Sequence, residues 1–289
     1  MKVAVAKYPI QAPASWAAFA ERQRTVLGEA AAAGAQLAVL PEYLSLELAS
    51  VLGPEVSKSL PASLRGIQAF HDDWLALYAD LSRSLNMIIQ AGTFLLQVGK
   101  GRYRNRAWWF SPDGQRGYQD KMQLTGFEKQ LGVIEPGDAL QVFDLGGVST
   151  GIAVCYDSEF PLSVRAQREA GARLLLVPSC TDTDAGSTRV AVGCMARALE
   201  NRMFIAKAVT AGEAAWSPAL DVNTGEAVLY APMDRGFPAD GVLASTVGDQ
   251  LWAMADLDFE ALTRCLDDAQ VTVDGDWGKQ RVAVGSGCG

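Results

Sequence analysis

The sequence predicts an α/β fold in which two sheets pack face to face between helices, a four-layer α-β-β-α sandwich. Both halves of the chain mix parallel β-α-β units with hairpins. The helices are amphipathic, whereas several strands are apolar on both faces, which suits a sheet packed on helices and on a second sheet. No internal repeat or low-complexity linker interrupts the pattern. We therefore expect one domain over residues 1–270 and a C-terminal tail over 271–289.

The first half opens with a β-α-β unit. Residues 2–7 alternate as a strand does, and Ser15 caps a helix that runs to Ala33 and ends at Gly34. A buried strand over 37–40 follows, so the two strands should be parallel. The further predicted elements are an irregular segment over 44–60, a helix over 64–85, a strand over 87–98, a hairpin of 104–110 with 115–119, and a charged irregular loop over 120–129.

The second half repeats this alternation of strands and helices. Its expected elements are a strand pair over 139–144 and 148–154, a helix over 161–170, a strand over 173–177, a helix over 187–200, a strand over 203–209, a hairpin of 217–221 with 226–230, a strand over 250–256 and a helix over 259–267. From residue 271 we expect an extended, mobile tail.

Composition excludes several classes of protein. The net charge is −8 and no basic cluster stands out, which argues against a nucleic-acid partner. The five cysteines are odd in number and widely spaced, so neither a disulfide framework nor a zinc site is indicated. The first strand does not resemble a signal peptide, and no apolar run reaches the length of a membrane span. These features predict a soluble cytoplasmic protein without a membrane partner.

The chain contains a single histidine, His71, which lies among acidic residues at a predicted helix start. A histidine-rich metal site is thereby excluded. His71 would have to be the base of any ordinary serine or cysteine hydrolase, but a solvated or capping histidine fits this position better. Acid–base chemistry is therefore expected from carboxylates or lysine.

The stretch from Val148 to Pro161 holds the main candidate nucleophile. It begins as a β-branched apolar run, reaches Cys155 and becomes polar at once, and Pro161 suits the first turn of a helix. Cys155 is thus predicted at the carboxyl end of a core strand, the edge at which ligands bind in α/β folds. The alternative is a buried cysteine that acts as a small hydrophobic side chain.

Two other ionisable residues occupy comparable positions. Glu42 follows the strand over 37–40, and Lys121 lies in the loop after the hairpin. A thiolate nucleophile, a carboxylate base and a fixed cation for the developing oxyanion suffice for hydrolysis without histidine. The backbone N–H of Tyr156 is a second candidate oxyanion donor, and Glu128 is placed to hold Lys121 or to orient a substrate amine.

Each of these charged residues also has a structural interpretation, because charged side chains are mostly exposed. Glu42 could be a surface carboxylate at a turn, and Lys121 a solvated loop charge. Glu128 could form a surface ion pair with Lys129.

Three blocks in this order resemble the signature of the nitrilase superfamily of carbon–nitrogen hydrolases. The blocks are Leu40-Pro41-Glu42, Asp120-Lys121-Met122-Gln123-Leu124-Thr125 with Phe127-Glu128, and Val154-Cys155-Tyr156-Asp157-Ser158-Glu159-Phe160-Pro161. The opening Val3-Ala4-Val5-Ala6, the strand that ends Val177-Pro178-Ser179 and the run from Ala196 to Arg202 also match. The similarity extends from residue 1 to about residue 260.

The resemblance implies the α-β-β-α fold, paired through its helices into an eight-layer homodimer. It implies Cys155 as nucleophile, Glu42 as general base, Lys121 as oxyanion stabiliser and Glu128 as an additional active-site glutamate. No metal and no organic cofactor is implied. One departure is Gln123, where the family commonly has histidine, and this affects expected substrate contacts and not the reaction.

Tyr156-Asp157 after the cysteine is closer to the amidase and carbamoylase branches than to the nitrile-hydrolysing members, which usually have Trp-Glu. The expected substrate is therefore a small amide or N-carbamoyl compound. The predicted substrate pocket comprises Tyr43, Phe127, Tyr156, Ser179, Cys180 and Thr181. Arg165 and Arg189 are candidates for binding a substrate carboxylate, although Arg165 also suits a helix-surface ion pair.

Other functions remain open at this point. The chain could hydrolyse nitriles, transfer an acyl group to an amine acceptor, or be a non-catalytic binding protein on the same fold. The presence of all four catalytic-type residues speaks against the last of these.

Overall fold

The computed structural model describes residues 1–267 and 269–280. Its strands follow one hydrogen-bonded path that divides into two sheets. The first sheet contains β1 (Lys2–Pro9), β2 (Leu37–Val39), β3 (Ile88–Gly99), β4 (Arg102–Phe110), β5 (Arg116–Asp120) and β13 (Trp252–Asp256). The second sheet contains β6 (Val142–Leu145), β7 (Val148–Ile152), β8 (Leu174–Ser179), β9 (Phe204–Glu213), β11 (Val228–Tyr230) and β12 (Val242–Ser245).

The two sheets join where β1 changes its partner. Residues Val3–Val5 pair in parallel with β2, whereas Lys7–Pro9 pair in parallel with the end of β9. The hydrogen-bonded order is β5-β4-β3-β2-β1-β9-β8-β7-β6. The carboxyl ends of the central parallel strands β2, β7 and β8 therefore come to the same region of the molecule.

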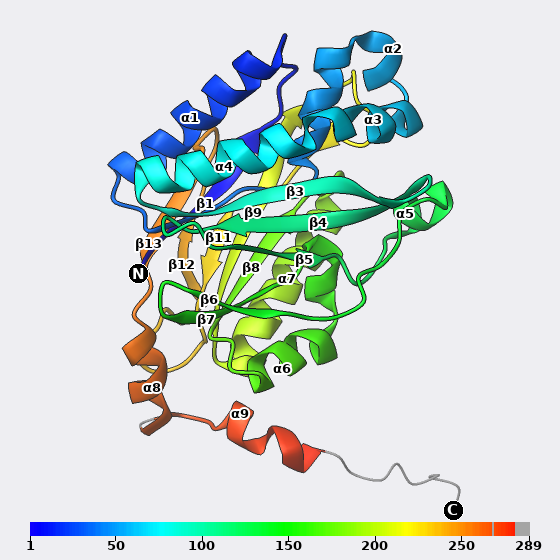
Figure 1. Ribbon diagram of the computed structural model, residues 1–289. Helices are drawn as coiled ribbons and strands as arrows, with labels where there is room; N and C mark the ends of the chain where they lie inside the picture. The colour runs from blue at the N-terminus through cyan, green and yellow to red at the C-terminus, as the bar shows by residue number, and fades with distance from the viewer. Residues whose placement is uncertain (268, 281–289) are drawn as a thin grey trace, which may run out of the picture.

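Helices cover the outer face of each sheet (Figure 1). The first sheet is covered mainly by α1 (Trp16–Ala32) and α4 (His71–Leu85), and the second by α6 (Pro161–Glu169) and α7 (Asp184–Asn201). The shorter helices are η1 (Leu44–Leu52), α2 (Pro54–Ser57), α3 (Leu60–Gly66), η2 (Ile67–Phe70), α5 (Gly126–Leu131), η3 (Cys155–Glu159), α8 (Phe259–Asp267), α9 (Val273–Asp276) and η4 (Trp277–Gln280).

Alternation along β1 shows how the sequence specifies these layers. Val3 and Val5 belong to the core shared with the second sheet, and Tyr8 belongs to the core under α1 and α4. Because successive side chains of a strand point to opposite faces, β1 is apolar on both sides. The predicted four-layer α-β-β-α sandwich is confirmed.

Local sequence signals explain where several helices begin and end. The Ser15 hydroxyl accepts a hydrogen bond from the Ala18 N–H at 3.1 Å and caps α1. Pro161 occupies the first turn of α6, and Asn86 ends α4 in a left-handed conformation.

Two predictions for the first helical layer were wrong. The irregular segment expected over 44–60 is mostly η1 and α2, and the single helix expected over 64–85 is divided into α3, η2 and α4. Pro54 and Pro61 lie in the first turns of α2 and α3, where the missing N–H of proline breaks no helical hydrogen bond. Neither proline lies within 64–85, where η2 separates α3 from α4. The loop expected over 120–129 contains α5, whose capping box between Thr125 and Glu128 supplies the start signal.

The hairpin expected from 217–221 and 226–230 was also wrong. β10 (Val222–Asn223) pairs with the end of β9, whereas β11 pairs with the beginning of β9 and with β12, a strand that was not predicted. The intervening Thr224 turns back to the end of β8, where its N–H donates to the Thr181 carbonyl at 2.8 Å. Pairing with the buried strand β9 removes the apolar side chains of β11 from water, which a local hairpin would leave more exposed.

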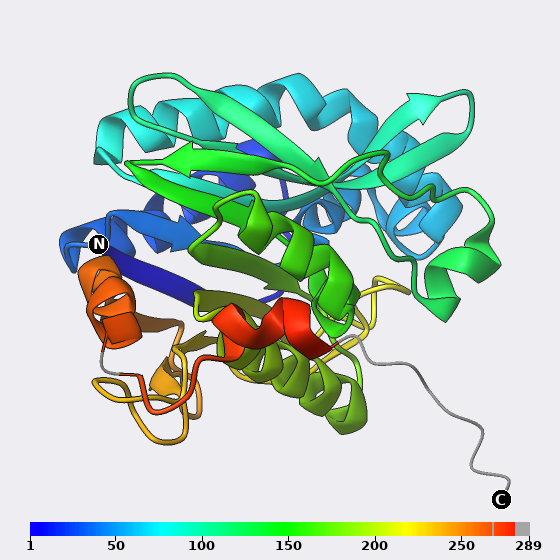
Figure 2. The ribbon, with the colours of Figure 1, turned by 90° about the horizontal axis from the view of Figure 1, so that it is seen from below.

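The C-terminal segment differs from the extended tail that was expected. Residues 273–280 form α9 and η4, and Figure 2 shows α9 lying across the outer side of the second helical layer. The Arg165 guanidinium stacks on the Trp277 ring at 4.8 Å, which holds this segment against α6. The prediction for 281–289 lies outside the described residues.

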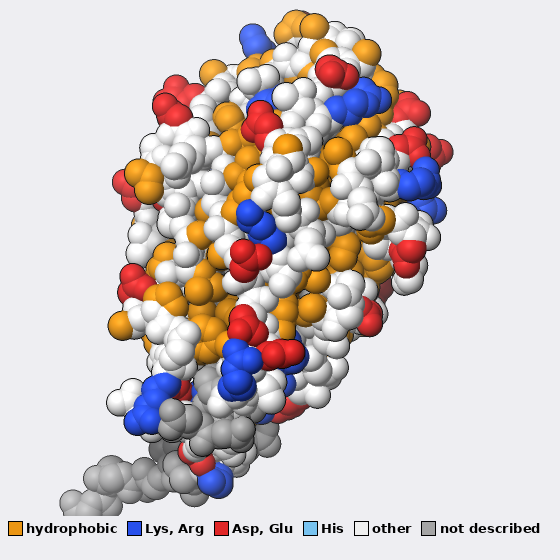
Figure 3. All heavy atoms as spheres, turned by 90° about the vertical axis from the view of Figure 1, so that its left-hand side faces the viewer, with side chains coloured by type: hydrophobic (Ala, Val, Ile, Leu, Met, Phe, Trp, Pro, Cys, Tyr) orange, Lys and Arg blue, Asp and Glu red, His pale blue; other side chains and the backbone are white. Residues whose placement is uncertain are grey.

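One side of the surface is seen in Figure 3, which faces the left-hand edge of Figure 1. Apolar side chains lie there in broad patches between scattered acidic and basic ones. Among the described residues of this face, lysine and arginine do not form the continuous basic tract that nucleic-acid binding needs. Over residues 1–267 and 269–280, no helix is both long and apolar enough to cross a bilayer.

Candidate active site

The ends of three strands bring together the charged residues singled out in the sequence. Glu42 follows β2, Lys121 follows β5, and Cys155 follows β7 at the first position of η3. The Lys121 ammonium is 2.8 Å from Glu42 Oε1 and 2.9 Å from Glu128 Oε2, and all three side chains are 1 % exposed. These residues therefore form one buried cluster, although 79 and 113 positions separate Glu42 from the other two strand-end residues along the chain.

Cys155 is held in an unusual backbone conformation. Its φ is +50°, a left-handed value that non-glycine residues adopt only when their surroundings enforce it. The thiol lies 3.5 Å from the Cys180 carbonyl oxygen. Helix α7 packs directly on the turn because Gly193 has no side chain there: a Cβ would lie 3.0 Å from the Ser158 carbonyl oxygen. The close packing of α7 on this turn therefore fixes the position of the Cys155 thiol.

Both oxygens of the Glu42 carboxylate accept hydrogen bonds. Oε1 accepts hydrogen bonds from Lys121 Nζ and from Asn105 Nδ2, both at 2.8 Å, and Oε2 accepts one from the Cys180 N–H at 3.1 Å. A hydrogen bond with the Cys155 thiol is among the contacts that lower the pKa of Glu42. Gly92, with φ +66°, allows β3 to approach this strand end, since a Cβ would lie 2.2 Å from the Pro41 carbonyl oxygen.

Glu128 is fixed by the short helix α5. It is the third helical residue, and its Oε2 accepts a hydrogen bond from the Thr125 N–H at 2.9 Å. Its Oε1 accepts one from the Tyr43 hydroxyl at 2.7 Å. Glu128 is thus a second carboxylate in contact with Lys121, and the alternative of a surface pair with Lys129 does not describe this buried side chain.

Burial and charge set the protonation of the cluster. Burial raises the pKa of Glu42, and Lys121 opposes this shift without cancelling it. Burial lowers the pKa of Lys121, but the two carboxylates raise it more, so that it ends well above its usual range. For Glu128, burial raises the pKa and Lys121 outweighs that effect, so the pKa is lowered. The lysine is therefore a permanent cation between two carboxylates.

Burial also raises the pKa of the Cys155 thiol well above its usual range, and the negative charge of Glu42 adds to the shift. The resting Cys155 side chain is consequently a thiol and not a thiolate. The Glu42 carboxylate forms a hydrogen bond with this thiol, and its charge has the largest electrostatic effect on the thiol.

The thiol faces a cavity of 340 Å³ at the strand ends. Its walls combine the charged cluster with aromatic and small side chains. The lining residues are Glu42, Tyr43, Lys121, Thr125, Phe127, Cys155, Tyr156, Glu159, Cys180, Thr181, Asp182, Gly186, Arg189, Val190, Pro218, Ala219 and Asp221. This volume suits a small organic molecule.

Five of the six predicted substrate-binding residues line this cavity: Tyr43, Phe127, Tyr156, Cys180 and Thr181. Ser179 does not. It is fully buried, and its hydroxyl donates to the Val177 carbonyl at 3.3 Å. Side chains alternate along a strand, so the residue next to Cys180 at the end of β8 points the other way.

The two candidate arginines are separated by the structure. Arg189 lines the cavity and lies 3.5 Å from Glu159. Arg165 pairs with Glu169 at 2.9 Å, stacks on Trp277 and is not among the cavity residues. His71 is also remote: its ring packs on Phe94 with centroids 5.1 Å apart.

Sequence reasoning missed several residues of the site. Asn105 links Glu42 to Glu128, and a polar residue at an inward-facing position of the strand over 104–110 was its only signal. The loop residues Pro218, Ala219 and Asp221 line the cavity because the end of β9 turns back over it. Asp157 accepts hydrogen bonds from the N–H groups of Met122 and Gln123, which follow Lys121, and the sequence pattern gives no signal for this contact.

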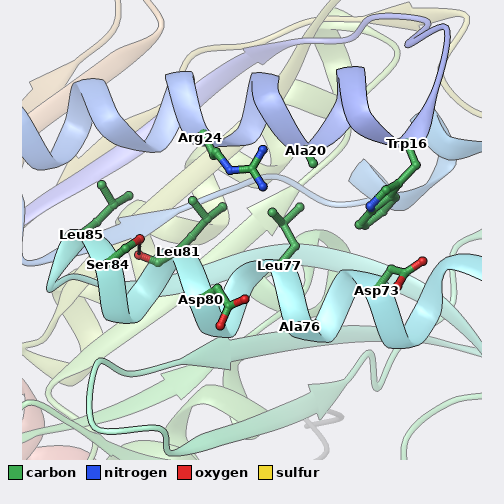
Figure 4. A pocket seen from close by; sticks show the side chains of 10 residues that line it. All are labelled: Trp16, Ala20, Arg24, Asp73, Ala76, Leu77, Asp80, Leu81, Ser84 and Leu85. Carbon is green, nitrogen blue, oxygen red and sulfur yellow. Dashed lines mark hydrogen bonds between the residues drawn. The ribbon is translucent and has the colours of Figure 1, made fainter.

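A second cavity, of 440 Å³, lies between α1 and α4 (Figure 4). Leu77, Leu81 and Leu85 line it, together with the charged residues Arg24 and Asp80. None of its lining residues is a cysteine or a lysine, so it lacks a nucleophile of the kind found at the strand ends. Among the described residues, no group of three or more His, Cys, Asp or Glu side chains is arranged to hold a metal ion.

Solved structures of other proteins have the same fold as this chain. The amidase from Nesterenkonia sp. AN1, solved after Michael addition of acrylamide at its active-site cysteine, superposes with a TM-score of 0.69 at 22 % identity, covering 93 % of this chain and 97 % of that one. Nit3 of Saccharomyces cerevisiae, a member of branch 10 of the nitrilase superfamily, superposes with a TM-score of 0.73 at 19 % identity over 94 % and 95 % of the two chains. These structures share the fold.

Relatives in sequence point the same way. The probable hydrolase YhcX of Bacillus subtilis (strain 168) is 29 % identical over 265 residues, which cover 91 % of this chain but 51 % of that protein, so the chain spans about half its length. Omega-amidase NIT2-B of Xenopus laevis is 23 % identical over 245 residues, 82 % of each chain. The model of the carbon-nitrogen hydrolase family matches residues 2–235, and the chain therefore belongs to that family.

Proposed function

We propose that this protein hydrolyses the carbon–nitrogen bond of a small amide or N-carbamoyl compound through a thioester on Cys155. The observation that carries the proposal is the Lys121 ammonium, clamped at 2.8 and 2.9 Å between Glu42 and Glu128 in the cavity that the thiol faces. The cluster supplies a nucleophile, a base and a fixed cation, which together meet the chemical needs of acyl transfer.

In the acylation half, Glu42 takes the Cys155 proton as the sulfur attacks the substrate carbonyl carbon. The carbonyl oxygen becomes an oxyanion, which Lys121 and the Tyr156 N–H stabilise. Glu42 then gives its proton to the nitrogen, the carbon–nitrogen bond breaks, and ammonia or an amine leaves. The product of this half is the Cys155 thioester.

In the second half, Glu42 takes a proton from water as the water oxygen attacks the thioester carbon. Lys121 again faces the oxyanion. The carbon–sulfur bond breaks, the thiolate regains its proton from Glu42, and the carboxylic acid is released. Glu128 does not exchange protons in this scheme. Its contacts with Lys121 and Tyr43 hold the cation in place.

Amides are favoured over nitriles for two reasons. Tyr156-Asp157 follows the cysteine, as in the amidase and carbamoylase branches, and the relatives include omega-amidases. A nitrilase of Pyrococcus abyssi (strain GE5 / Orsay) is also similar, at 30 % identity over 65 % of this chain, so nitriles belong in the test.

The test is an ammonia-release screen over matched amides, N-carbamoyl acids and nitriles, with neutral, cationic and anionic end groups on one carbon skeleton. Amide or N-carbamoyl turnover that disappears in Cys155→Ala is expected. Turnover of nitriles alone, or full amide turnover by Cys155→Ala, would contradict the proposal. Repeating the assay with hydroxylamine separates hydrolysis from acyl transfer, because a transferase forms hydroxamate in preference to acid.

We also propose that the active form is a homodimer that uses the parts of the outer side of α6 and α7 that α9 leaves exposed (Figure 2). Large apolar side chains are exposed there: Leu162 is 74 % and Val192 58 % exposed. Contact with a second copy of the chain would remove these two apolar side chains from water.

A further inference from the structure

Asp157 is a buried carboxylate whose neighbours lie beside both candidate catalytic groups. It is 3 % exposed, within η3, two residues after the nucleophile. Its oxygens accept hydrogen bonds from three backbone N–H groups, at 2.7 Å from Gln123, 3.2 Å from Met122 and 3.0 Å from Val154. Met122 and Gln123 directly follow Lys121, and Val154 directly precedes Cys155.

We propose that Asp157 is a positioning residue that fixes the Lys121 ammonium relative to the Cys155 thiol by holding the two backbone segments on one carboxylate. It touches neither substrate nor the reacting atoms. The proposal deepens the function proposed above, because it concerns the distance between the oxyanion cation and the nucleophile of that reaction.

The need for such a link follows from the topology. Lys121 follows β5 of the first sheet, and its own backbone is tied to that sheet: its N–H donates to the Asn105 carbonyl at 2.9 Å. Cys155 follows β7 of the second sheet, where the Ala153 N–H donates to the Leu176 carbonyl at 3.0 Å. The two groups therefore sit on different sheets, and a small shift of one sheet against the other would separate them.

The geometry requires a charged acceptor. A carboxylate offers lone pairs on both oxygens and has no hydrogen to turn toward the converging N–H groups. Hydrogen bonds to a charged group are also stronger than neutral ones. An asparagine at this position would direct its NH₂ group toward either Val154 or the Met122–Gln123 pair, and one link would be lost.

Charge near Asp157 supports this role. Burial raises the pKa of Asp157 to about 6, while Lys121 and the three backbone N–H groups lower it. The carboxylate is therefore ionised above that pH, the condition under which it accepts all three bonds. On the α7 side, Arg197 donates to the Ser158 carbonyl at 3.1 Å, which anchors the same turn.

The test compares Asp157→Asn with Asp234→Asn. Asp234 is the control for the loss of a carboxylate that accepts backbone hydrogen bonds: it accepts them from the Arg235 and Gln270 N–H groups, pairs with Arg202 and is not among the residues that line the cavity. Both variants should lose thermal stability. Only Asp157→Asn should lose kcat, by about 100-fold, the scale of a misplaced catalytic group, with KM changed by less than about threefold.

A second readout follows the thiol itself. The groups that face it are Glu42, Lys121 and Cys180, with Lys207 of β9 also contributing charge. If Lys121 moves away in Asp157→Asn, the pH midpoint for alkylation of Cys155 by iodoacetamide should rise, whereas Asp234→Asn should keep the wild-type midpoint. This measurement needs no substrate, so it tests the positioning role even if the wild-type protein releases no ammonia from any amide.

An Asp157→Asn protein that loses stability but keeps the wild-type kcat and alkylation midpoint would show a merely structural role and overturn the proposal. Should that variant not fold, Asp157→Glu replaces it: the charge remains, but the carboxylate moves by one methylene. We expect a reduced kcat and a raised alkylation midpoint for it, and wild-type values for both would equally overturn the proposal.

Discussion

Replacing Lys121 with methionine removes the cation while keeping a side chain of similar length. In the native protein the ammonium is 1 % exposed and contacts Glu42 at 2.8 Å and Glu128 at 2.9 Å. Without it, two carboxylates face each other in a buried site. We expect Lys121→Met to lose both catalysis and stability.

The magnitudes follow from the contacts. Removing one partner of a buried ion pair typically costs about 3–5 kcal/mol of unfolding free energy, because the remaining charge is left uncompensated. Removing an oxyanion donor typically lowers kcat by about 10²–10³-fold. Lys121 has both roles in the proposed mechanism, so we expect a loss of kcat of about 10³-fold and of stability of about 3–5 kcal/mol near neutral pH.

The stability deficit should depend on pH with a definite sign. In Lys121→Met, burial and mutual repulsion raise the pKa values of Glu42 and Glu128 with no cation to lower them. A carboxyl whose folded-state pKa lies above its unfolded value loses stability as pH rises from the unfolded value through the folded one. The deficit should therefore shrink as pH falls toward about 4, where the carboxyls are protonated in both states.

The assay is urea unfolding at several pH values, together with initial rates on the best amide from the screen. Lys129→Met is the matched control, because Lys129 lies on the same short helix and is exposed. It should leave kcat and stability nearly unchanged. Wild-type kcat in Lys121→Met, or a deficit that grows toward acid pH, would refute this reasoning.

The remaining predictions concern the nucleophile, two buried residues and the helical surface. Cys155→Ala should fold with a near-native Tm and show no turnover. Tyr43→Phe removes the 2.7 Å hydrogen bond to Glu128 and should lower kcat by about tenfold, the scale of one hydrogen bond to a charged group. An unchanged kcat would show that this hydrogen bond has no role in catalysis. Burial raises the pKa of Glu47 to about 7, so the contribution of Glu47 to wild-type stability should fall by about 3 kcal/mol between about pH 4.5 and about pH 8, and Glu47→Gln should show a correspondingly smaller loss over that range in urea unfolding. Val192→Glu should convert a dimer to a monomer in gel filtration, whereas a wild-type monomer would remove the basis of the dimer proposal.

Much of the fold could be predicted because local chemistry and global layers agree. Alternation along residues 2–9 predicts a strand, Ser15 predicts the start of a helix, and Pro161 predicts the first turn of another helix. The structure has β1, α1 and α6 at these places. Positions at strand carboxyl ends also follow from parallel pairing, which is why Glu42 and Cys155 were expected at one edge.

Other features depend on contacts between distant segments and left no local signal. The segment that ends in β11 contains a strong turn sequence, but its apolar residues find β9 as a partner, and long-range pairing overrides the local turn. Asn105 looks like an ordinary polar residue between two arginines of a strand. Its role as a bridge between Glu42 and Glu128 exists only after α5 has folded over the site.

Ser179 illustrates a different limit. Proximity in sequence to Cys180 and Thr181 suggested a shared pocket, yet strand alternation turns its hydroxyl into the core. A pocket prediction from adjacent residues needs the phase of the strand, and that phase was set by the register of β8 against β9.

The most direct test of the proposed chemistry is intact-protein mass spectrometry of an acid-quenched reaction with a turned-over amide. We predict a mass increase equal to the acyl group, located on the peptide that contains Cys155 and absent in Cys155→Ala. An adduct on Cys180 or Cys194, or continued turnover by Cys155→Ala, would contradict the assignment of Cys155 as the nucleophile.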